Sequence, residues 1–116
     1  MFTHELARAM LFNYAKLAGY RGKFALTLSK PRFDATIEAG KFADEAAARA
    51  DETGEFGAVL PHLEPPLVWI NPRTNTISSR LCRTAAHEAL HLAMPTLPHG
   101  RGFDRRVAAL LRLERL

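Results

Sequence analysis

Histidines and a glutamate gather between residues 87 and 99, and their types and spacing fit metal chemistry. The stretch His87-Glu88-Ala89-Leu90-His91 places two imidazoles four residues apart with a carboxylate after the first. Residues i and i+4 share one face of a helix, so nitrogens of His87 and His91 can bind the same metal ion. Glu88 then lies within reach of a water molecule at that ion. The pattern predicts metal-assisted hydrolysis with zinc as the cofactor.

The residues around this motif predict the helix that its spacing requires. Residues 80–94 contain neither Gly nor Pro, Pro95 prevents continuation, and Ser78 and Ser79 offer N-cap oxygens. The helix should therefore span about 79–94. Its apolar residues surround it on nearly all sides, which is typical of a helix in the core. Polar motif residues in a core need partners, and a divalent cation provides one for each of them.

His99 is the candidate for a third ligand, because a catalytic zinc site has three protein ligands and a water. It follows His91 by eight residues, and Pro95 and Pro98 restrict the chain between them. Gly100 permits a positive φ or a close approach. The alternative is that His99 is an ordinary polar loop residue, in which case Asp104 and His62 are the fallback ligands.

A last helix should follow over about 101–115. Apolar residues recur there at helical spacing and should pack against the motif helix. They are Phe103, Val107, Leu110 and Leu111.

The two motifs together resemble those of the SprT-like zinc metalloproteases, in which HExxH is followed by a third histidine in an HGxxF context. The matching residues are His87-Glu88-Ala89-Leu90-His91 and His99-Gly100-Arg101-Gly102-Phe103, and the resemblance covers about residues 67–112. It implies a minimal zincin-like metalloprotease domain in which His87, His91 and His99 bind zinc. It also implies that Glu88 is the general base and that Phe103 packs behind the third ligand.

In the mechanism so implied, zinc activates a water molecule, and Glu88 takes its proton and returns it to the leaving amine. The substrate is a protein or peptide. The spacing selects no donor to the negatively charged intermediate, for which the candidates are Tyr14, Tyr20, His62 and Arg101.

Two other classes of protein fit the same residues. One is a regulatory peptidase resembling the ImmA/IrrE group, which recruits a downstream acid; only Asp104 and Glu114 follow His99. The other is a non-catalytic nucleic-acid-binding or regulatory protein stapled by zinc, which would have four protein ligands and no position for water.

Composition predicts one domain over residues 1–116, since 47% of the residues are apolar. No apolar run approaches the roughly 20 residues of a membrane-spanning helix, and the first residues do not resemble a signal peptide, so a cytoplasmic location is expected. The single cysteine, Cys82, excludes an intramolecular disulfide and is expected to be a buried structural thiol.

The charges are distributed unevenly along the chain. Residues 1–33 carry six Lys and Arg against one acid, residues 34–64 two against eight, and residues 73–116 eight against three. If the first and last helices pack together, their basic residues form a positive face that makes DNA a candidate partner. The alternative is that these arginines are solvated helix faces.

The remaining pattern predicts an α+β fold with an N-terminal helix and a small antiparallel or mixed sheet of three or four strands. The first helix should begin at a Thr3 cap and end at Gly19. Alternation predicts a hairpin of strands at 24–28 and 33–37, with Lys30-Pro31 as the turn.

Two further strands are expected at 56–60 and 67–71, joined without a tight hairpin. The prolines before Leu67 suggest that the last strand lies at an edge. The resemblance suggests that an edge strand near 56–70 binds substrate backbone. The alanine-rich residues 42–53 are either a short helix or mobile.

Overall fold

The α+β class predicted from the sequence is confirmed by the computed structural model, which describes residues 2–40 and 56–114. The described elements are α1 (His4–Leu17), β1 (Ala25–Thr27), α2 (Lys30–Gly40), β2 (Gly57–Leu60), β3 (Leu67–Ile70), α4 (Ser78–Ala93) and α5 (Arg101–Glu114). The uncertain stretch 42–53 lies outside the described residues. No described helix has the length and apolar character needed to cross a bilayer.

The three described strands form one mixed sheet in the order β1-β3-β2. β1 runs parallel to β3, whereas β2 runs antiparallel to it. β3 is therefore the central strand, and the predicted edge position is wrong. Pro65 and Pro66 precede β3, so they remove no N–H group from its ladder, and the Pro66 carbonyl accepts a hydrogen bond from the Ala25 N–H at 2.8 Å.

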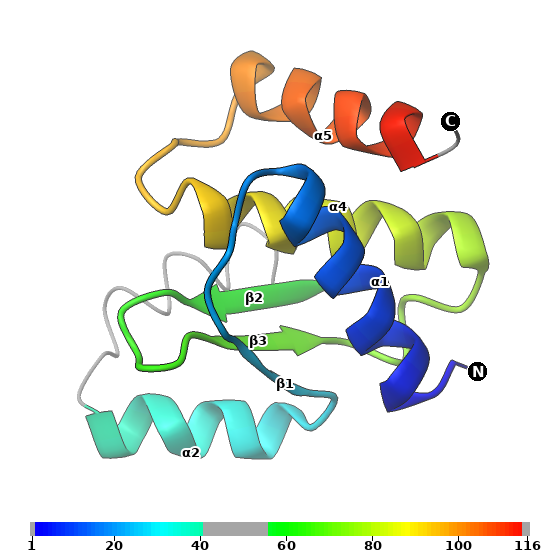
Figure 1. Ribbon diagram of the computed structural model, residues 1–116. Coiled ribbons are helices and arrows are strands. Elements are labelled where there is room, and N and C mark those ends of the chain that lie inside the picture. Colours follow the sequence, from blue (N-terminus) through cyan, green and yellow to red (C-terminus); the bar gives the residue numbers. More distant parts are fainter. Residues whose placement is uncertain (1, 41–55, 115–116) are drawn as a thin grey trace.

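Both faces of this sheet are buried, and successive side chains along a strand point to opposite faces. Val59, Val68 and Ile70 join the larger core with α1, α4 and α5. Their neighbours Ala58, Leu60 and Trp69 join a smaller core that contains Phe33 of α2. Figure 1 shows the resulting layers, with α4 on one side of the sheet and α2 on the other.

The segment predicted as a second strand at 33–37 is instead part of α2, so the predicted hairpin is wrong. Phe33 and Ile37 fit an alternating pattern, but they are also four residues apart and share a helical face. Ser29 begins the helix, since its Oγ accepts the Arg32 N–H at 3.3 Å. Pro31 lies in the first turn, where its missing N–H costs nothing. A helix in this connection also suits the parallel pairing of β1 with β3, which a hairpin cannot produce.

α1 begins and ends as predicted and packs on α4. The Thr3 hydroxyl accepts the Leu6 N–H at 3.1 Å, and Gly19 has φ 93° just after the helix. The motif helix α4 matches its predicted span to within one residue, but the predicted serine cap is wrong. Its N-cap is Ile77, which makes no side-chain bond, and both serines lie in the first turn.

Substitutions at two neighbouring residues of α1 can test which side of this helix packs in the core. Leu11 is fully buried, whereas the Phe12 side chain is 57% exposed. Leu11→Ala should lower the free energy of unfolding by about 2–5 kcal/mol, because it opens a cavity. Phe12→Ala removes a larger side chain but should change it by less than about 0.5 kcal/mol. Urea unfolding measures both, and a larger loss for Phe12→Ala would contradict this packing.

Candidate metal centre

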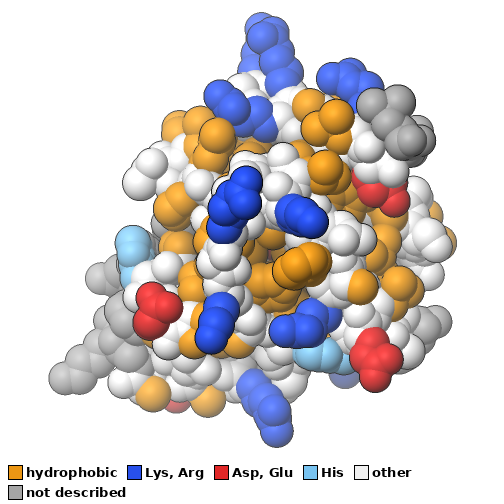
Figure 2. All heavy atoms as spheres, viewed as in Figure 1, with side chains coloured by type: hydrophobic (Ala, Val, Ile, Leu, Met, Phe, Trp, Pro, Cys, Tyr) orange, Lys and Arg blue, Asp and Glu red, His pale blue; other side chains and the backbone are white. Residues whose placement is uncertain are grey.

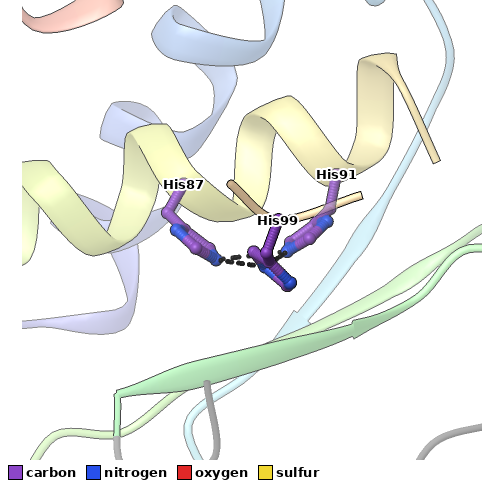
Figure 3. A group of neighbouring side chains, drawn as sticks. All are labelled: His87, His91 and His99. Atoms are coloured by element: carbon purple, nitrogen blue, oxygen red, sulfur yellow. Dashed lines mark hydrogen bonds between the residues drawn. The ribbon is translucent and has the colours of Figure 1, made fainter. Parts of the chain in front are cut away.

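Three imidazoles converge on one point beside α4. The Nε2 atoms of His87 and His99 are 3.1 Å apart, those of His87 and His91 3.2 Å, and those of His91 and His99 3.0 Å. Figure 3 shows His87 and His91 projecting from successive turns of α4, with His99 reaching the same point from the following loop. The structure thus brings together all three predicted ligands.

These three contacts cannot all be hydrogen bonds at once. An N–H···N bond joins a protonated nitrogen to one with a free lone pair, and a neutral imidazole Nε2 is one or the other. Among three nitrogens at least two are of the same kind, so at least one contact brings together two donors or two lone pairs. A cation at the centre of the group removes this conflict, because all three lone pairs can then point at it.

The separations also suit zinc. Tetrahedral zinc with nitrogen ligands at about 2.0–2.1 Å requires nitrogens about 3.4 Å apart. The observed 3.0–3.2 Å is slightly shorter, so small side-chain rotations would accommodate the ion. A ligand set of three imidazoles is typical of zinc and leaves one coordination position for water or substrate.

The loop after α4 delivers His99 to this group. The helix ends at Ala93 before Pro95, and the Leu97 N–H donates to the Met94 carbonyl at 3.1 Å, which turns the chain. Met94 and Leu97 both pack against the larger core and so anchor the loop. Gly100 follows with φ 149°, a conformation that favours glycine, as the sequence suggested.

Phe103 of α5 forms the apolar floor of the cluster. Its ring centroid lies 4.7 Å from those of His87 and His91 and 4.8 Å from that of His99, and its side chain is fully buried. The expected packing of Phe103 against His99 is confirmed, whereas the role of His99 as a ligand stays a prediction. A rigid aromatic ring in contact with all three imidazoles restricts their rotation and thus preorganises the site.

Glu88 lies next to β2, on the same helix as two of the imidazoles. It is buried, and a Cβ added to Gly57 would lie 2.8 Å from its Oε2 atom and 2.7 Å from the Trp69 carbonyl oxygen. The backbone of Gly57, the first residue of β2, therefore packs directly against the Glu88 carboxylate. Only glycine leaves room for this approach.

Burial keeps His87 in the neutral form that a metal ligand requires. The pKa of His87 is lowered from 6.5 to about 4, mainly by desolvation and next by the electrostatic effect of the neighbouring His99. Asp104 of α5 acts in the opposite direction, and Arg83, one turn earlier on α4, again favours the neutral ring. At neutral pH this imidazole has a lone pair available for a cation.

The other predicted site residues do not join this group. His62 and Asp104 are exposed, and neither belongs to the cluster that could hold a metal. Cys82 is half-buried against the core rather than fully buried.

The four candidate oxyanion donors also lie outside the histidine cluster. Tyr14 is buried in the core, the Tyr20 hydroxyl donates to the Lys23 carbonyl, and His62 and Arg101 are exposed.

The sequence analysis missed Gly57, which packs against Glu88, and the pair of Thr84 and Asn75. Asn75 and Thr84 are both buried and hydrogen-bonded to each other. A signal for one of them exists in the sequence, because Thr84 is a polar residue one helical turn before Glu88 on a largely apolar helix. No comparable signal marks Asn75, which reaches the site from a turn.

Comparisons of the chain with protein-family models, with curated proteins and with solved structures found no match. The resemblance to the SprT-like proteases therefore stays a prediction from the two motifs.

The lowered pKa of His87 predicts a pH-dependent stability for the metal-free protein. Between pH 6.5 and about 4 the unfolded chain takes up a proton on this ring that the folded chain refuses. The contribution to the free energy of unfolding is therefore complete above pH 6.5 and is lost as the pH falls toward 4. We therefore expect the free energy of unfolding of the chelator-treated wild type to decrease relative to that of His87→Gln as the pH falls from 6.5 to about 4. Urea unfolding of both proteins measures this difference. An identical pH dependence in both proteins would refute the shift.

Proposed function

We propose that this chain is a zinc-dependent metallopeptidase of the SprT-like type, with His87, His91 and His99 as zinc ligands and Glu88 as general base. The observation that carries the proposal is the convergence of three Nε2 atoms to within 3.2 Å of one another, two of them from the helix that also carries the buried Glu88. The cluster supports metal binding, and the glutamate that follows His87 in the sequence supports hydrolysis rather than a purely structural metal.

The chain's own residues supply positioning and proton transfer in this proposal. A zinc ion, when bound, makes a water molecule acidic near neutral pH and polarises a carbonyl. Glu88 accepts the proton of the attacking water and returns it to the leaving amine as the peptide bond breaks. Phe103 and the buried face of α4 hold the imidazoles in place, so that little rearrangement accompanies the reaction.

A protein or peptide substrate follows from the resemblance to the SprT-like proteases. Among the described residues β2 pairs only with β3, so β2 rather than β3 is an edge strand of the described sheet. Its residues Ala58, Val59 and Leu60 are nevertheless at most 4% exposed. The predicted binding of substrate backbone by a strand near 56–70 therefore stays a prediction.

The number of clustered side chains favours an enzyme over a zinc-stapled binding protein. Within residues 2–40 and 56–114, the group that could hold a metal ion has three members, which leaves a position for water. The same group does not include Asp104 or Glu114, the acids that an ImmA/IrrE-type site would need.

DNA stays a candidate partner within this proposal. The two helices that carry many of the basic residues, α1 and α5, contact each other, and Figure 2 shows Lys and Arg side chains spread over their face of the molecule. One of them, Arg8, has its guanidinium 5.9 Å from the centre of the Phe24 ring. The support for DNA is the positive charge of this face alone.

Removing the base should separate metal binding from turnover. Glu88→Gln keeps the shape of the side chain but cannot accept a proton. It should retain one zinc per chain while the hydrolysis of an unfolded protein such as casein falls by about 100-fold or more. Metal content by mass spectrometry and casein cleavage on gels measure the two effects.

Two histidine variants provide the controls. His91→Ala should lose both zinc and activity and should unfold at a lower temperature, because the ring is buried in the cluster. His62→Ala removes an exposed histidine outside the cluster and should change neither property. Full hydrolysis by Glu88→Gln, or loss of zinc from His62→Ala, would sink the assignment.

A further inference from the structure

Two buried polar side chains, Asn75 and Thr84, connect the residue before β2 to the motif helix α4. Asn75 is 3% exposed and Thr84 is 5% exposed. The Asn75 Nδ2 group donates to the Phe56 carbonyl at 3.0 Å and to the Asn71 carbonyl at 2.7 Å, and its Oδ1 atom accepts the Thr84 hydroxyl proton. Both amide hydrogens and the amide oxygen are used, so the side chain has one favourable orientation.

These bonds fix the backbone that packs against Glu88. The Phe56 carbonyl also accepts the Asn71 N–H at 2.9 Å, so two donors hold the chain at the entry to β2. The next residue is Gly57, whose added Cβ would meet Glu88 Oε2 at 2.8 Å and Thr84 Cγ2 at 3.3 Å. Thr84 and Glu88 are one turn apart on α4, so the strand entry contacts both residues on the same helical face.

We propose that Asn75 and Thr84 are positioning residues for Glu88. By holding Phe56 and Gly57 against α4, their hydrogen bonds set the surface on which the Glu88 carboxylate rests. This role rests on the proposed function of Glu88 as general base. A general base must lie within hydrogen-bond reach of the proton it accepts, and misplacement by about 1 Å can cost about 100-fold in rate. A purely structural role would lower stability without a selective effect on turnover.

The test uses a matched pair of variants at Thr84 in the zinc-loaded protein. Thr84→Val keeps the shape of the side chain but leaves the Asn75 Oδ1 atom without its donor. Thr84→Ser keeps the hydroxyl. For Thr84→Val we expect kcat to fall by about 10-fold to 100-fold with KM and zinc affinity unchanged. For Thr84→Ser we expect kcat to stay within about threefold of wild type.

Two results would overturn the proposal. One is a folded Thr84→Val protein with wild-type kcat. The other is a parallel loss of zinc affinity and kcat, which would assign the pair to the metal scaffold instead. If Thr84→Val does not fold, Gly57→Ala decides the question, since its methyl group would lie 2.8 Å from Glu88 Oε2 and so force the carboxylate to move. Retention of full activity by a folded Gly57→Ala protein refutes the proposal.

The activity of the wild-type protein shows whether a failure lies in the proposed peptidase function or in the positioning role of Asn75 and Thr84. Wild-type protein that binds zinc but cleaves no protein would end the peptidase assignment. The positioning claim is then read from crystal structures of wild type and Thr84→Val. An unchanged Glu88 side chain in the variant would end it, and a displaced carboxylate would support it.

Discussion

Three imidazole nitrogens within 3.2 Å of one another form a contact that hydrogen bonding alone cannot satisfy. The cluster is partly buried, so solvent can relieve the conflict only in part, and burial lowers the pKa of His87, which favours its neutral form. A cation is the one partner that accepts three lone pairs at once. The rest of the structure can be understood as the scaffold that makes this convergence stable: a core helix, a stiff loop and an aromatic floor.

Each part of that scaffold holds one or more of the three histidines, or Glu88, in place. α4 lies between the sheet and α5 (Figure 1), and its buried apolar residues belong to the larger core, so the helix that carries His87 and His91 is fixed in place. Leu97 anchors the loop, and Phe103 contacts all three rings. On the other side, Gly57 brings the strand edge to Glu88. The imidazoles, the carboxylate and the start of β2 are thus held by elements that pack in the larger core, and the same packing that stabilises the fold preorganises the candidate site.

Much of this could be predicted from the sequence, because the strongest signals were local. His87 and His91 share a helical face by spacing, and Pro95 marks the end of α4. The position of α2 could not be settled in this way, because Phe33 and Ile37 fit both the strand and the helix periods. Only the tertiary pairing of β1 with β3 decides between them. The pair of Asn75 and Thr84 could not be found either, since their contact depends on how a turn packs against α4.

The most direct test of the central claim is the coordination of zinc in the purified, metal-replete protein, measured by X-ray absorption at the zinc edge. The account predicts one zinc per chain with three histidine nitrogens at about 2.0–2.1 Å and one further oxygen from water. His99→Ala should reduce the histidine contribution by one. Absence of stoichiometric zinc, or a fourth ligand from the protein such as a thiolate, would contradict it.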